Sequence, residues 1–181
     1  MASRRNVLIG VSAWIAAGLS GCAVGSQPSS DQSRTYCLKN SKTLRRICTP
    51  ERIPSADAEI QAKRFEPTPG LLTVYVVRWG WGDGVRPLLL TLDGTTRIGT
   101  LPRSLIQMRL VPGDHTVAFD WDDKTHRHVI RGSAGEVRFV ELTGSSFPTE
   151  PSYEWSDIDP AGARVRARKS RLVADIGSTG G

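Results

Sequence analysis

The stretch LIQMRLVPGDHTVAFDW, residues 105–121, decides the fold class. Apolar and polar residues alternate in its first half, so that Ile106 and Met108 share one face of an extended chain. The same period of two returns in the second half, at Val117 and Phe119. A Pro-Gly-Asp sequence lies between the halves, and these residue types favour a turn. The stretch therefore predicts two half-buried strands joined by a turn.

The same pattern continues on both sides of this stretch. Asp-Gly at 93–94 and Asp-Asp at 122–123 predict further turns, and turns recur about every ten or twenty residues. Strands are predicted at 71–78, 85–92, 96–101, 105–111, 117–121, 126–131 and 136–143. This rhythm predicts a mainly β protein: an antiparallel β-sandwich of about seven strands with short flanking helices. The helices are expected at 55–64 and after Asp159-Pro160.

The N-terminal residues have the order of an export signal. Two arginines precede an apolar run at 7–19, and the run leads into Leu-Ser-Gly-Cys at 19–22. This ending resembles the lipobox of bacterial lipoproteins, which implies removal of residues 1–21 and lipidation of Cys22. The apolar run is too short to span a bilayer, which takes roughly 20 residues. The resemblance leaves the export route open between the general secretory and twin-arginine pathways.

The resemblance to lipoproteins also predicts a location. Ala23, rather than Asp, follows the cysteine, and in Gram-negative lipoproteins this favours the outer membrane. The protein is then expected to be anchored to the membrane by its N-terminal lipid and to face the periplasm. Nucleic acid is not expected as a partner there.

After the signal, the chain divides into four segments: a flexible tether at 22–35, an N-terminal segment with two cysteines at 36–66, the β-sandwich at 67–158 and a basic C-terminal segment at 159–181. Cys37 and Cys48 remain once Cys22 is lipidated, and an oxidising compartment predicts a disulfide between them. A metal or redox role is less favoured, because there is no Cys-x-x-Cys and no nearby histidine.

The charge is concentrated at the C-terminal end. The formal net charge is +6. Arg4 and Arg5 would be removed with the signal, the body of the chain is neutral, and the remaining +4 lies from Pro160 onward. Anionic lipid head groups or carboxylates of the cell wall are the predicted contacts. A merely solvated charged face is the alternative. The basic residues concerned are Arg164, Arg166, Arg168, Lys169 and Arg171.

The run Trp-Gly-Trp-Gly-Asp-Gly at 79–84 is the best candidate for a binding site. Trp79 and Trp81 would offer a platform for a partner protein or a sugar ring, because exposed aromatic side chains are favoured anchors. The alternative is a long hairpin loop whose tryptophans fold back over the open end of the sandwich.

Other candidates are weaker. His126 and His128 share a strand face and lie near three aspartates at 120–123, but a zinc site needs three or four convergent ligands. Exposed strand histidines are the alternative. The chain has no recognisable catalytic or phosphate-binding motif, so we expect a protein that is not an enzyme and has neither cofactor nor metal.

Five blocks of the body resemble a family of bacterial lipoprotein domains of unknown function, similar to PEGA-type surface β-sandwich domains. The blocks are AKRFEPTPG (62–70), TVYVVR (73–78), LDGTTRIG (92–99), LVPGDH (110–115) and GEVRFVEL (135–142). The resemblance implies a sandwich with a surface role and brings no catalytic residues. The sequence thus predicts a lipid-anchored interaction or accessory module of the cell envelope. The alternative is a saccharide- or metal-binding lipoprotein.

Overall fold

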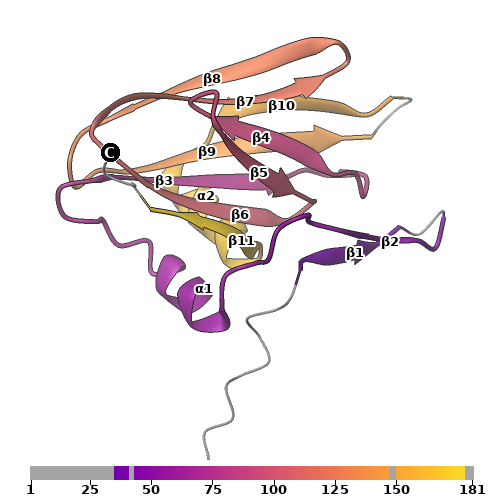
Figure 1. The fold of residues 1–181 in the computed structure, drawn as a ribbon, viewed down its shortest axis with the longest axis horizontal. Coiled ribbons are helices and arrows are strands. Elements are labelled where there is room, and N and C mark those ends of the chain that lie inside the picture. The colour runs from indigo at the N-terminus through magenta and orange to yellow at the C-terminus, as the bar shows by residue number, and fades with distance from the viewer. Residues whose placement is uncertain (1–34, 41–42, 147–149, 178–181) are drawn as a thin grey trace, which may run out of the picture.

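The computed structural model describes residues 35–40, 43–146 and 150–177 (Figure 1). The predicted signal, Cys22 and all but the last residue of the predicted tether lie outside the described residues. The elements are β1 (Cys37–Lys39), β2 (Arg46–Cys48), α1 (Ala56–Ala62), β3 (Leu72–Trp79), β4 (Leu88–Leu92), β5 (Thr96–Thr100), β6 (Ser104–Leu110), β7 (Gly113–Trp121), β8 (Lys124–Gly132), β9 (Val137–Ser145), β10 (Ser152–Asp157), α2 (Pro160–Arg168) and β11 (Arg171–Ile176).

Two sheets pack face to face and bury the main core between them (Figure 1). One sheet has five strands in the order β10-β9-β3-β6-β11, and the other has four in the order β5-β4-β7-β8. The inward faces are those that the alternation predicted: Ile106 and Met108 from one sheet meet Val117 and Phe119 from the other. The prediction of a mainly β, sandwich-like fold is confirmed.

The two helices form a third layer on the outer face of the five-stranded sheet. Their apolar residues pack on Phe65, Tyr75 and Phe139, whose rings contact one another with centroids 5.1–5.5 Å apart. The buried hydroxyl of Tyr75 accepts a hydrogen bond from Gln107 Nε2 at 3.1 Å. Burial raises the pKa of Tyr75 to about 12.

Both helices begin where the capping residues predict. Ser55 accepts a hydrogen bond from the backbone N–H of Ala58, and Asp159 accepts one from that of Gly162. Pro160 occupies the first turn of α2, where its missing N–H removes no helical bond.

The pairing of the strands differs from a purely antiparallel sandwich. The central strand β3 pairs antiparallel with β6 but parallel with β9, and the edge strand β11 pairs parallel with β6. Strands β6 and β7, which residues 105–121 were predicted to form, lie in different sheets. The turn at Pro112-Gly113 therefore carries the chain from one layer to the other. The described residues also contain strands that the sequence did not predict: β1, β2, β10 and β11.

The predicted division between the sandwich (67–158) and the basic segment (159–181) does not match the structure. Strand β11 completes one edge of the five-stranded sheet, and α2 covers that sheet's outer face. The C-terminal segment is therefore part of the folded body.

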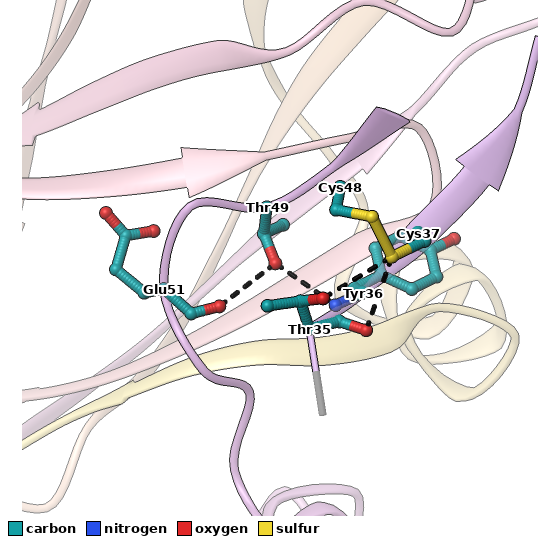
Figure 2. The surroundings of a disulfide bond; sticks show 6 residues. All are labelled: Thr35, Tyr36, Cys37, Cys48, Thr49 and Glu51. Atoms are coloured by element: carbon teal, nitrogen blue, oxygen red, sulfur yellow. Dashed lines mark hydrogen bonds between the residues drawn. A yellow bond between two sulfur atoms is a disulfide. The ribbon is translucent and has the colours of Figure 1, made fainter. Parts of the chain in front are cut away.

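The predicted disulfide is confirmed. Cys37 and Cys48 face each other across the β1–β2 hairpin with their Cα atoms 3.9 Å apart (Figure 2). Beside them, Thr49 Oγ1 accepts a hydrogen bond from the Tyr36 backbone N–H and donates one to the Glu51 carbonyl. The Tyr36 hydroxyl, in turn, donates to the Pro102 carbonyl at 3.0 Å. The hairpin is thereby fastened to the sandwich at the turn between β5 and β6.

Candidate functional site: the Trp81 loop

The Trp81 loop comprises residues 80–87 and connects β3 to β4. Trp79, the other tryptophan of the glycine-rich run, is the last residue of β3. Alternation along this strand sends the side chain of Arg78 between the sheets and that of Trp79 toward the helix layer, where it packs on the aromatic cluster. The loop then crosses from the five-stranded to the four-stranded sheet, so it is not the hairpin loop considered above.

A buried ion pair closes the loop from inside. Arg78 Nε and Nη2 donate hydrogen bonds to the two carboxylate oxygens of Asp83, both at 2.9 Å. The two side chains are 1% and 3% exposed. Arg78 also donates to the Thr100 carbonyl and to the Tyr153 hydroxyl. Such two-bond pairing with further donors satisfied fixes the geometry of both residues.

The loop is also held by close packing against strand β9. A Cβ atom on Gly80 would lie 1.9 Å from the carbonyl oxygen of Gly144 on β9, and a Cβ on Gly144 would lie 2.6 Å from the Asp83 carboxyl carbon. Only glycine permits this approach at both positions. Gly84 adds a hydrogen bond from its N–H to Ser146 Oγ at 3.2 Å. The loop is therefore fixed to the sheet on both sides of Trp81.

The tryptophans consequently have different roles. Trp79 is half-buried against the aromatic cluster, whereas Trp81 is 82% exposed. The alternative in which both rings fold back over the sandwich is wrong for Trp81. An exposed indole on a fixed loop is a ready contact surface.

A pocket of about 310 Å³ opens beside the exposed indole. Its lining brings together the loop and the β5–β6 turn. The lining residues are Trp79, Gly80, Trp81, Gly82, Asp83, Pro102 and Arg103.

Arg103 is the member that sequence reasoning missed. Its guanidinium carbon lies 5.7 Å from the centre of the Trp79 ring, a cation–π contact between segments 24 positions apart. A local signal existed in the dipeptide Pro102-Arg103, because proline favours a turn and would draw attention to the residue after it.

The five basic C-terminal residues fall into two groups. Arg166 is paired with the buried Glu141 of β9, and Arg171 lies 2.7 Å from Glu59 of α1. The remaining three are exposed: two guanidinium groups lie over the rings of Phe139 and Phe65, and the ammonium group is beyond the end of α2. These three are Arg164, Arg168 and Lys169.

The histidine pair faces inward, which corrects the expectation of exposed strand histidines. The ring of His126 stacks on Phe119 with a centroid distance of 4.9 Å, and His128 Nε2 lies 3.5 Å from Asp157 Oδ1. Both side chains are half-buried. Asp122 and Asp123 form the tight β7–β8 turn, as predicted. Within the described residues, no three His, Cys, Asp or Glu side chains converge as a metal site.

Comparison with family models and with curated proteins finds no match for the chain. The resemblance to PEGA-type domains therefore stays a prediction. Neither described helix has the length and apolar character needed to cross a membrane.

Proposed function

We propose that the protein is a non-enzymatic, lipid-anchored module of the cell envelope that contacts its partner through the Trp81 loop. The observation that carries this proposal is the combination at Trp81 of high exposure and a fixed backbone. Folding does not bury this indole, although the loop around it is held by an ion pair and two glycine contacts. Exposed aromatic side chains of this kind are typical of binding sites.

A fixed loop supports binding for an entropic reason. A contact residue that is already ordered loses little conformational freedom when its partner arrives, so more of the interaction free energy appears as affinity. Trp79 and the Arg78–Asp83 pair act as supports for Trp81 in this proposal and need not touch the partner.

The place of action follows from the N-terminal residues. Cys22 in its lipobox context would anchor the protein to the outer membrane, facing the periplasm. The exposed basic residues Arg164, Arg168 and Lys169 would contact anionic lipid or cell-wall carboxylates. The partner of the Trp81 loop would be another envelope protein or a cell-wall component.

The test is site-specific photo-cross-linking in intact cells. A photoreactive phenylalanine derivative, which keeps an aromatic ring at the position, replaces Trp81 in one variant and Val129 in a matched control. Val129 is also exposed but lies on β8, away from the loop. We expect a defined cross-linked product, protein or glycan, from position 81 and none from position 129. The same pattern from both positions, or no product from position 81, would contradict the proposal.

A further inference from the structure

Among the described residues that line the Trp81 pocket, Arg103 is a cation that is not paired with a carboxylate. The one carboxylate among the lining residues, that of Asp83, forms an ion pair with Arg78 and is almost fully buried. Among the described residues, no carboxylate oxygen lies within 4.0 Å of the Arg103 guanidinium, whose carbon lies over the Trp79 ring. A cation–π contact engages the charge of a guanidinium with a ring face and occupies none of its N–H donors with a carboxylate. The pocket is thus arranged to receive an anion.

The backbone at Arg103 shows what the side chain contributes. Ser104 Oγ bonds both the N–H and the carbonyl of Leu101, which closes a turn with Pro102 and Arg103 at its centre. Arg103 has a φ of 61°, a conformation in which glycine carries no penalty and arginine does. What arginine adds, against this backbone preference, is the guanidinium over Trp79 at the pocket.

The rest of the lining suits a polar ligand with one flat face. Trp81 offers an indole face for stacking, and its neighbours Gly80 and Gly82 bring backbone groups, without side chains, to the pocket. A pyranose ring has this character, because its C–H groups form an apolar face and its hydroxyl groups form hydrogen bonds around the edge. About 310 Å³ accommodates a single sugar ring with its substituents.

We propose that the pocket binds a saccharide that carries a carboxylate. The sugar ring stacks on Trp81, and the Arg103 guanidinium donates hydrogen bonds to the carboxylate. This inference rests on the proposed function and specifies its partner: an acidic glycan rather than a protein. Sugar acids of the cell wall and of other envelope glycans share this chemistry.

The test is calorimetric titration of the full chain in detergent with two sugars that differ in charge. N-acetylmuramic acid carries a carboxylate, whereas N-acetylglucosamine has the same ring without one. We expect the acid to bind at least about tenfold more tightly, the factor that one charged hydrogen bond contributes. Glucuronic acid is a third probe: its binding at equal strength would indicate acidic glycans in general, and weaker binding would indicate the cell wall.

Two variants test which residue binds the sugar ring and which binds the carboxylate, and a third serves as a control. Trp81→Ala is expected to weaken both N-acetylated sugars at least about tenfold. Arg103→Gly is expected to remove the preference for the acid while the protein melts at the same or a higher temperature, because the turn favours glycine. Arg127→Ala, at an exposed arginine of β8 outside this pocket, is the matched control and should change nothing.

Some outcomes would overturn the inference. These are equal binding of the two N-acetylated sugars to the native chain, an acid preference that survives Arg103→Gly, or binding of neither sugar. Preferential binding of a dipeptide with a free C-terminal carboxylate would replace the saccharide by a peptide. If no sugar binds but position 81 still cross-links to a protein, the saccharide inference fails and the proposed function stands. If the cross-link is also absent, both fail.

Discussion

Arg78 and Asp83 form a two-bond ion pair that is withdrawn from solvent at the open end of the sandwich. The pair spans the loop that presents Trp81 and ties it to β5 and β10 through the other contacts of Arg78. One relationship between two side chains thus links the stability of the core to the shape of the candidate site.

Removing one partner of this pair should be strongly destabilising. Asp83→Ala leaves the Arg78 guanidinium buried without its counter-ion, which typically costs about 3–5 kcal/mol. Urea unfolding measures the loss. Asp114→Ala is the matched control, because it breaks the exposed Arg131–Asp114 pair, and such pairs contribute about 0–1 kcal/mol. Equal effects of the two substitutions would show that the Arg78–Asp83 pair contributes no more than a surface contact.

His115 is expected to make stability depend on pH. Its Nδ1 lies 2.7 Å from Asp93 Oδ2 and its Nε2 lies 2.8 Å from the Val111 carbonyl, so the charged ring satisfies both acceptors. Burial lowers the pKa of His115, but the hydrogen bonds to Asp93 and Val111 and the charges of Asp93 and Asp114 outweigh it, and the pKa is raised above 6.5.

The sign follows from linkage. A folded-state pKa above the unfolded value means that the folded protein holds the proton more tightly. The contribution of His115 is therefore complete below about pH 6.5, the unfolded value, and is lost as pH rises through the folded pKa. Urea unfolding of the native chain and of His115→Gln at pH 5.5 and pH 9 should show a difference that is larger at pH 5.5. A difference that grows with pH would contradict this prediction.

The disulfide should stabilise the N-terminal hairpin without being required for the fold of the sandwich. Cys37 and Cys48 close a loop with a sequence separation of 11, for which the chain-entropy model gives about 2–3 kcal/mol. Replacing both cysteines by serine should make the hairpin a more accessible target for proteolysis, whereas the core should still unfold cooperatively. Limited proteolysis and thermal unfolding measure the two effects. Loss of cooperative unfolding would show that the hairpin is part of the folding core.

The exposed basic residues should bind anionic surfaces, and the paired ones should not. Replacing Arg164, Arg168 and Lys169 by alanine should weaken sedimentation with vesicles that contain anionic lipid, since each basic residue near such a surface contributes about 1 kcal/mol. Salt should weaken the native interaction in the same way. Arg166→Ala is the matched control. It should lower stability, by leaving the buried Glu141 unpaired, rather than vesicle binding.

Cys22→Ala tests the anchor. Without the thiol no lipid can be attached, so the protein should move from the membrane fraction to the soluble fraction and lose labelling by radioactive palmitate. Cys48→Ala is a suitable control, because it removes a cysteine of the hairpin and should leave the protein on the membrane. Membrane retention of the Cys22 variant would contradict the lipoprotein prediction.

Local patterns were sufficient to predict most of the strands. The alternation at Ile106 and Met108 and the Asp-Asp turn at 122–123 are properties of neighbouring residues, and the structure confirms them. Parallel pairing of β3 with β9 joins residues more than 60 positions apart, and no local pattern encodes it. Strand β11 was missed for a related reason: the strand it pairs with, β6, lies more than 60 positions earlier in the chain.

At the candidate site, too, features of neighbouring residues could be predicted and contacts between distant residues could not. Trp79 and Trp81 were recognisable because their glycine-rich run is unusual by itself. The reason that the run is rigid was not recognisable, since it depends on the contact with Gly144 in a distant strand. Arg103 reaches the site only through the tertiary fold, and the sequence presents it as an ordinary turn residue.

The hydrogen bond from Tyr36 to Pro102 has a consequence for where the site operates. It holds Tyr36, near the first of the described residues, beside the turn that carries Arg103, so this end of the described chain lies close to the pocket. From Cys22, the proposed site of lipidation, to Tyr36 the chain has a contour length of at most about 50 Å. The pocket would thus search a thin layer next to the membrane, where the local concentration of a wall-bound ligand, rather than a high intrinsic affinity, would determine its occupancy.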